Sequence, residues 1–347
     1  MANKWSYKEK IMQCSKKNIS FTVSLKLSFA VVSIFGLSGC LSDSVNVTIP
    51  LPSITQGVAQ MIGSPLIECD VPGWRVTAIG EIADETGATW QTPADVSFVD
   101  GPRAHDVYNE CNDVTLPNAQ ALDLDRLAVT ELDADGELFS VYFFGDNYAE
   151  IFVNGQLIGV DPVPYWPFNT SVVQFRVKRP FTLAAKLVDW EENLNLGSEL
   201  MRGVPFHTGD GGFVAVVKDA NGETIDITDD SWRVQFYYVS PLEDPTCLGR
   251  KNGSRSSVAC DVPEKANAEQ AYALRWPVPE GWAAPTFDDT NWPFATTYTN
   301  EDIGGSLQRP AYMNFTGLFD DAQDDAQFIW SSNLLLDNIV LARKQVE

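Results

Sequence analysis

The sequence predicts an all-β fold, a β-sandwich with long loops at one end. The 20 Pro, 24 Gly and 10 Trp among its 347 residues indicate many turns and short strands rather than long helices. Between residues 138 and 238, short apolar or alternating segments are separated by tight-turn sequences. Both observations favour a chain built almost entirely of antiparallel strands.

The first 39 residues are expected to be a lipoprotein signal peptide. Six lysines precede Cys40 against one acid, and the apolar run 27–36 has the length of a signal-peptide core rather than of a membrane span. The motif Leu37-Ser38-Gly39-Cys40 resembles the lipobox of bacterial lipoproteins. The resemblance implies that Cys40 is diacylated and becomes the new N-terminus. An ordinary signal peptide with an accidental cysteine is the alternative.

The lipid on Cys40 would hold the chain at a membrane without spanning it. Leu41 follows the cysteine directly, where lipoproteins retained at the inner membrane carry Asp, so the resemblance points to the outer membrane of a bacterial cell envelope. Residues 40–66 are rich in Ser, Thr, Pro and Gly and are expected to be the lipidated cysteine and a flexible tether. Residues 67–347 would form the β-sandwich domain, with an N-terminal extension and a disulfide-stapled insertion near 240–275.

The part of the chain that follows the signal peptide is strongly acidic. Removing the six lysines and the one glutamate before Cys40 leaves 18 Lys and Arg against 46 Asp and Glu, a formal net charge of −28. Such a surface repels nucleic acid and anionic headgroups. The predicted partners are therefore the membrane, through the lipid, and a glycan ligand, but no nucleic acid.

Four cysteines remain once Cys14 and Cys40 are set aside, and an even number in an exported chain indicates disulfides. Of the three possible pairings, we favour the two between nearest neighbours, Cys69–Cys111 and Cys247–Cys260. The second would staple a polar loop. Because the chain has only two His and no CxxC spacing, a structural zinc site is not expected.

The strands are predicted in order from apolar or alternating runs, bounded by turn sequences such as Asn154-Gly155, which is typical of a type I′ hairpin. The predicted strands are 74–82, 95–100, 138–144, 148–153, 156–159, 172–177, 181–188, 213–218, 223–228 and 231–238.

If each strand crosses the sandwich once, successive connections alternate between its two ends. The tight turns then share one end: 154–155, 178–180 and 219–222. The long connections share the other: 160–171 and 189–212, together with Asp146 and Asn147. Long loops gathered at one end of a β-scaffold are typical of a binding site.

Four segments resemble galactose-binding-like β-sandwiches, which occur as accessory domains of secreted glycoside hydrolases and in uncharacterised secreted bacterial proteins. They are the hairpin 146–159, Thr228-Asp229-Asp230-Ser231-Trp232, Phe287-Asp288-Asp289-Thr290-Asn291-Trp292 and the closing segment 328–338. The resemblance covers roughly residues 138–345 and implies a jelly-roll fold. It does not imply galactose, because this scaffold binds many ligands or none.

The long loops carry aromatic and acidic side chains suited to sugars. In the proline-rich loop 161–169, exposed rings would stack on sugar faces; the alternative is that these rings are buried on the core. In the second loop, carboxylates beside a Trp would bind a sugar or calcium, and a His near an Asp would hold a polar ligand or a metal. The predicted ligand-binding residues are Asp146, Asn147, Tyr165, Trp166, Trp190, Glu191, His207 and Asp210.

No cofactor is assigned, although one structural calcium ion stays open. The acidic segments 133–137 and 320–325 are interpreted as a turn and a solvated loop, since the first lacks the spacing of a calcium loop. No GxSxG, HExxH or P-loop motif is present, so no enzyme activity is assigned. The predicted function is a carbohydrate-binding module. A structural or adhesive envelope protein that binds another protein comes second, and a small glycosidase third.

Overall fold

The computed structural model describes most of the chain from residue 51 onward. The described residues are 51–67, 76–92, 94–97, 99–161, 170–189, 199–200, 211–251, 253–262, 269–303, 317–321 and 325–347. They belong to one unit, Ile49–Glu347. No helix in these ranges has the length and apolar character to cross a membrane. The signal peptide and the lipidated Cys40 lie outside the described residues.

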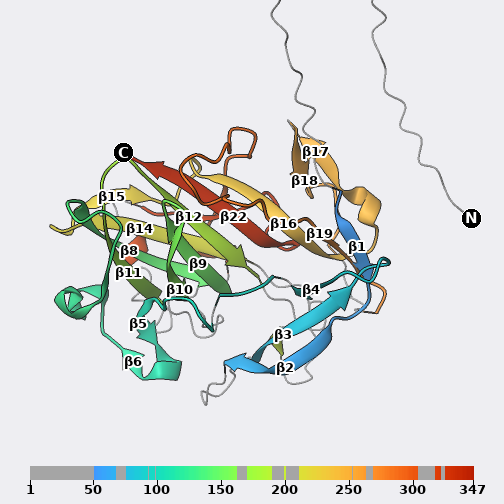
Figure 1. The fold of residues 1–347 in the computed structure, drawn as a ribbon, viewed down its shortest axis with the longest axis horizontal. Helices are drawn as coiled ribbons and strands as arrows, with labels where there is room; N and C mark the ends of the chain where they lie inside the picture. The colour runs from blue at the N-terminus through green and yellow to red at the C-terminus, as the bar shows by residue number, and fades with distance from the viewer. Residues whose placement is uncertain are drawn as a thin grey trace, which may run out of the picture. The chain divides into compact units, whose positions relative to one another are not determined.

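Two mainly antiparallel sheets confirm the predicted all-β sandwich (Figure 1). The first has the spatial order β1 (Ser53–Gln56), β19 (Tyr272–Arg275), β16 (Arg233–Leu242), β22 (Asp337–Val346), β12 (Phe181–Val188), β9 (Tyr148–Val153) and β10 (Gln156–Asp161). The second has the order β20 (Thr296–Tyr298), β21 (Phe328–Trp330), β14 (Gly212–Asp219), β8 (Glu137–Asp146), β11 (Thr170–Val177), β5 (His105–Asn109) and β6 (Val114–Thr115). Two further strands extend it: β15 (Thr224–Ile227) on β14 and β7 (Val129–Glu131) on β11.

The remaining described strands form two small sheets: β13 (Glu199–Leu200), β3 (Val76–Ala83), β2 (Gln60–Ile67) and β4 (Thr89–Thr92) in one, and β17 (Gly249–Lys251) with β18 (Ser254–Ser256) in the other. Helical structure in the described residues is limited to single turns: η1 (Glu110–Asn112), η2 (Ala119–Ala121), η3 (Leu124–Arg126), η4 (Pro245–Cys247) and residues 317–319.

The second sheet is buried on both faces. Along β8, alternate side chains such as Phe139 and Phe143 point into the sandwich core, where Phe139 packs 5.1 Å from Phe181 of the first sheet. The intervening side chains, such as Tyr142 and Phe144, belong to a second apolar cluster. Strands buried on both faces read as continuous apolar runs rather than as alternating ones. This explains why β8 shows no polar periodicity in the sequence.

The strand registers confirm the predicted division of connections between the two ends. Gly212 pairs with Asp146 and Ser171 with Phe143, so the strand ends that lead into both long loops lie beside Asp146. In the first sheet, Val188 pairs with Tyr148, which places the start of the second loop at the same end. We call this the loop end. The loop segments 162–169, 190–198 and 201–210 lie outside the described residues.

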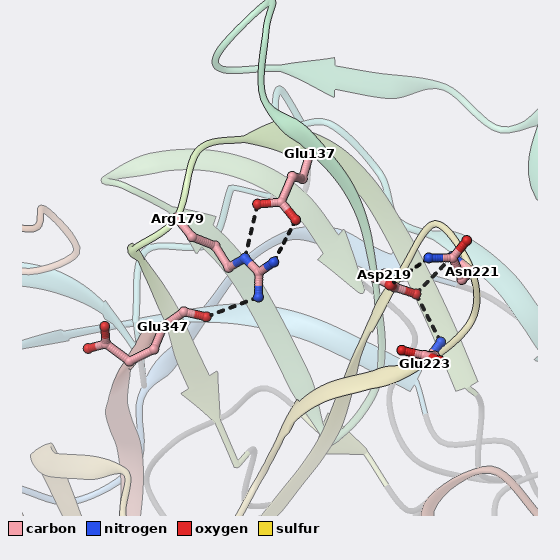
Figure 2. Close-up of polar contacts among 6 residues, drawn as sticks. All are labelled: Glu137, Arg179, Asp219, Asn221, Glu223 and Glu347. Carbon is pink, nitrogen blue, oxygen red and sulfur yellow. Dashed lines mark hydrogen bonds and ion pairs between the residues drawn. The ribbon is translucent and has the colours of Figure 1, made fainter.

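The opposite end holds the tight turns, closed by polar contacts (Figure 2). Arg179 donates to both carboxylate oxygens of Glu137, at 3.0 and 2.6 Å, and to the backbone oxygen of Glu347 at 3.3 Å. Asp219 accepts hydrogen bonds from the backbone N–H of Asn221 and Glu223. These side chains are exposed, so each contact contributes little free energy on its own and mainly shapes its turn.

Two sequence predictions near the N-terminus differ from the structure. The described residues of 95–100 are not a strand. Side chains hold this segment instead: Ser97 N–H donates to Glu150 at 2.8 Å, and Lys186 donates to the Asp95 carbonyl. Part of the predicted tether is also strand, because β1 pairs with β19 and β2 pairs with β3. β1 has only four residues, and Gly63 and Pro65 interrupt the sequence of β2, so neither strand shows the alternation that distinguishes a strand from a tether.

The disulfide Cys247–Cys260 confirms one predicted pairing and closes the β17–β18 hairpin onto η4. Cys111 is disulfide-bonded as well. Its predicted partner, Cys69, lies outside the described residues, so that pairing stays a prediction.

Replacing Cys247 and Cys260 together by Ser should lower the free energy of unfolding by about 3 kcal/mol. The bridge spans 13 residues of sequence, and the loop-entropy account assigns that amount to a loop of this size. Urea denaturation followed by fluorescence measures it. Each single Cys→Ser variant should lose about as much as the double variant, and a double variant as stable as the wild type would contradict the prediction.

Candidate functional site

The two described members of the predicted ligand-binding set lie buried at the loop end. Asp146 is 3% exposed and Asn147 is 2% exposed, and Asn147 Nδ2 donates to Asp146 Oδ1 at 2.8 Å. Asp161 and Asp189, where the two loops begin, are buried beside them. The other six lie outside the described residues: Tyr165, Trp166, Trp190, Glu191, His207 and Asp210. Their contact with a ligand stays a prediction.

A pocket of about 410 Å³ lies alongside β16, between the β17–β18 hairpin and the segment 290–296. Volumes of this order hold small-molecule ligands. Figure 1 shows the hairpin beside β16 and β19. The described residues that line the pocket are Arg233, Lys251, Ser254, Arg255, Ser256, Thr290, Asn291, Trp292, Pro293, Phe294, Thr296 and Ser332. We call it the basic pocket because three of these residues are cations and none is acidic.

Arg233 and Phe294 form one wall of the basic pocket. The guanidinium carbon of Arg233 lies 3.6 Å from the centre of the Phe294 ring, and its Nη1 donates to the Trp292 carbonyl at 3.0 Å. Backbone hydrogen bonds hold the 293–295 segment against the start of β16. Phe294 is nevertheless 57% exposed. The wall thus combines a stacked cation with an accessible aromatic ring.

Arg255 forms the inner part of the pocket. Its guanidinium lies over the rings of Tyr237 and Trp276, with the carbon at 4.4 and 4.9 Å from the ring centres. Nε and Nη2 both donate to the Phe236 carbonyl, at 3.2 and 2.6 Å. Burial lowers the pKa of Arg255 below its usual value, although the guanidinium stays protonated. This cation is held by aromatic faces, one carbonyl and the Tyr237 side chain, and the charge of Asp337 also acts on it.

The β17–β18 hairpin concentrates positive charge at the pocket. Its register sets Arg250 directly opposite Arg255 and Lys251 opposite Ser254. Like charges directly opposite each other on paired strands are destabilising. In the described part of the chain, no carboxylate forms an ion pair with Arg233 or Lys251, and the carboxyl group whose charge acts on Arg255 is that of the buried Asp337. The chain as a whole has 47 Asp and Glu against 24 Lys and Arg. The pocket therefore has the opposite sign to the chain as a whole.

The wall segment is anchored to β22 by Arg343, which is 3% exposed. Arg343 Nε donates to Asp289 at 2.7 Å, and its Nη atoms donate to the carbonyls of Trp282 and Ala284. Ser254 Oγ donates to the Asn291 carbonyl and ties the hairpin to the same segment. Both walls of the pocket are thus fixed to the first sheet.

Motifs singled out in the sequence act as supports for this architecture. Asp288 caps a turn through Thr290, and Trp292 packs on Phe287 with ring centres 5.5 Å apart. Trp232 lies in the sandwich core, 6.1 Å from Phe213. Sequence reasoning missed the basic pocket itself. The available signal was the cluster Arg250-Lys251 and Arg255 inside the predicted disulfide loop, in a chain poor in cations.

The acidic segments considered for calcium show no metal site in the described part of the chain, where no group of three His, Cys, Asp or Glu side chains could hold an ion. Residues 133–136 form the predicted turn, with Gly136 N–H donating to the Asp133 carbonyl at 2.9 Å. Lys178 pairs with Asp135 at 2.7 Å.

Comparison with known proteins gives no match to this chain among family models, curated proteins or solved structures. The chemistry of the basic pocket is therefore inferred from its own residues.

A buried carboxyl group lies behind the pocket. Asp337, at the start of β22, has no exposed surface and makes a hydrogen bond with the Ser331 hydroxyl, beside the lining residue Ser332. Burial raises the pKa of Asp337 to about 7, against the opposing effects of the Ser331 hydrogen bond and the Arg255 charge. Asp337 is therefore largely protonated below neutral pH.

Asp337 should make the protein less stable as pH rises from about 4 to 7. In that range the folded state holds a proton that the unfolded state has released, so the unfolding free energy falls with pH. Asp337→Asn should remove this pH dependence, which amounts to a change of up to about 4 kcal/mol in the unfolding free energy between pH 4 and 7. Urea denaturation at pH 4, 5.5 and 7 measures the difference from wild type.

The matched control is Asp288→Asn. Hydrogen bonds from Thr290 lower the pKa of exposed Asp288, so its titration lies below the tested range and the variant should keep the wild-type slope. Equal slopes in wild type and Asp337→Asn would contradict the assignment.

Proposed function

We propose that this chain is a lipid-anchored, extracytoplasmic binding protein for carbohydrate, with the basic pocket as its described binding site. The observation that supports this proposal most directly is the composition of that pocket. One exposed aromatic ring, hydroxyl and amide side chains, and three cations meet in a volume of about 410 Å³. Aromatic faces contact the C–H faces of sugars, while hydroxyls, amides and cations hydrogen-bond sugar oxygens.

Three further features support the proposal. The signal-peptide pattern ending at Cys40 fits a lipid-anchored chain. The Cys247–Cys260 disulfide fits an oxidising compartment outside the cytoplasm. The two-sheet architecture and the four motifs that resemble galactose-binding-like sandwiches fit a scaffold that carries sugar sites in other proteins. The loop end, with Asp146 and Asn147 below it, is a second candidate surface for the same ligand.

Phe294→Ala should weaken glycan binding about five- to tenfold, because the loss of one stacking ring costs about 1 kcal/mol or more. The full chain, purified in non-ionic detergent, is screened on a glycan array with calcium and with chelator. The strongest ligand is then titrated against each variant by calorimetry.

Val99→Ala is the control, since it removes an exposed apolar side chain that does not line the pocket. It should bind as the wild type does. Failure to bind any glycan in either condition would refute the proposed function. Binding that survives Phe294→Ala but is lost in Trp166→Ala would move the site to the loop end.

Cys40→Ala should abolish lipid attachment and release the chain from the membrane fraction. Cells expressing each variant are labelled with an alkyne fatty acid and fractionated. Cys14→Ala, which removes a cysteine ahead of the lipobox, should label as the wild type does. Label retained in Cys40→Ala would contradict lipidation at this cysteine.

A further inference from the structure

We propose that the basic pocket selects anionic glycans, and that Arg233, Lys251 and Arg255 receive a carboxylate or sulfate group carried by the sugar. This inference rests on the proposed function and names its ligand class. The chemistry common to both groups is a compact oxyanion with several acceptor oxygens. Such a group needs several N–H donors converging on one point, which guanidinium and ammonium groups supply.

Charge carries the first part of the inference. In a chain with about twice as many acids as bases, the described lining of one pocket holds three cations and no acid. A neutral sugar needs no such concentration. The Arg250–Arg255 juxtaposition costs stability in the free protein, and a bound anion would offset that cost. Arg233 and Lys251, which no described carboxylate pairs with, are therefore matched to an anion supplied by the ligand.

Hydrogen-bonding capacity carries the second part. A guanidinium has five N–H donors. Among the described residues, Arg233 donates to one carbonyl. Arg255 donates to one carbonyl through Nε and Nη2 and is also hydrogen-bonded to the Tyr237 side chain. The remaining donors are the ones available to a ligand. Because the Phe294 ring and the Trp292 carbonyl both hold the Arg233 guanidinium, its remaining N–H groups are placed for contact with an oxyanion at low cost in side-chain entropy.

The aromatic wall distinguishes a charged sugar from a free anion. Phe294 is exposed at the pocket, and Thr290, Asn291 and Thr296 add polar groups on the same side. An inorganic anion would use only the cations. A sugar that bears the anion would also use the ring face and the hydroxyls. The pocket is too large for an oxyanion alone, but its volume of about 410 Å³ fits the sugar as well.

The test compares three probes on the full chain in non-ionic detergent by calorimetry. They are tetragalacturonate, its fully methyl-esterified form, and a sulfated galactan tetrasaccharide. At least one of the two anionic probes should bind ten times or more tightly than the ester, which has the same backbone without charge. The better anionic probe identifies the group, carboxylate or sulfate. Its affinity should fall as salt is raised from 50 to 300 mM.

Variants link that preference to the pocket. Arg233→Gln and Lys251→Gln should each weaken the better anionic probe about tenfold and the ester much less, because the ester carries no charge that these cations could pair with. Arg233→Lys keeps the charge but loses the planar fork, so it should give an intermediate loss. Arg126→Gln is the matched control. It removes the same charge from an exposed residue of η3 that does not line the pocket, and it should bind as the wild type does.

The outcomes separate this inference from the proposed function. Equal affinity for the ester and both anionic probes, with binding still sensitive to Phe294→Ala, would overturn the inference and keep carbohydrate binding. Anionic binding that Arg233→Gln and Lys251→Gln do not weaken would also overturn it. No binding of any probe, together with an empty glycan array, would refute the proposed function itself. If inorganic sulfate displaces the better anionic probe fully at equal concentration, the pocket binds anions without selecting a glycan, and the inference is overturned.

Discussion

The register of β8 against its neighbours β11 and β14 is the constraint on which the rest of the fold depends. β8 lies between two apolar clusters, so its alternate side chains fill two different cores. A slip of one residue would move Phe143 into the cluster that now holds Phe144, and Phe144 into the cluster that now holds Phe143. Every other side chain on β8 would change faces in the same way. Close packing on both faces therefore excludes neighbouring registers. Once this register holds, the strand ends beside Asp146 must gather at one end of the sandwich and the tight turns at the other.

Two arginines placed opposite each other show how the scaffold separates support from site. Arg233 on β16 pairs in register with Arg343 on β22. Arg343 is buried, paired with Asp289 and bonded to two carbonyls, so it is fully used in holding the segment that continues into the pocket wall. Truncating Asp289 would leave the buried charge of Arg343 without its carboxylate and would destabilise this segment. Arg233 has the same side chain without a described carboxylate partner and lines the pocket instead. The first arginine fixes the wall, and the second lines the pocket that we propose as the binding site.

The sequence predicted the parts of this structure that depend on local pattern. Long alternating or apolar strands and the Asn154-Gly155 turn have strong signals, and the rule that connections alternate between ends placed the loop end from strand order alone. The same reasoning took the segment 95–100 for a strand, because apolar alternation does not reveal that Glu150 and Lys186 would hold it by side chains. It also missed the basic pocket. That pocket joins residues near 233, 255 and 294, and only the pairing of β16 with distant segments brings them together. No local sequence pattern predicts that these residues lie together in space. The cluster of cations in 250–255 was nevertheless unusual in a chain with about twice as many acidic as basic residues.

The contrast between an acidic chain and a basic pocket determines how an anionic ligand can approach. The formal net charge, −28 for the chain from Cys40 onward, opposes any polyanion at long range, but at physiological ionic strength that repulsion is screened over about 8 Å. Inside the pocket the separations are shorter than this and burial lowers the effective dielectric constant, so the three cations dominate. Outside it, exposed Asp288 lies two residues before the lining residue Thr290, and a long polyanion laid across the surface would meet such carboxylates. A short chain, or the end of a long one, can insert one charged sugar into the pocket and keep its other charges in solvent. For the proposed anionic ligand, this charge pattern favours insertion of a single acidic sugar over binding along a polymer.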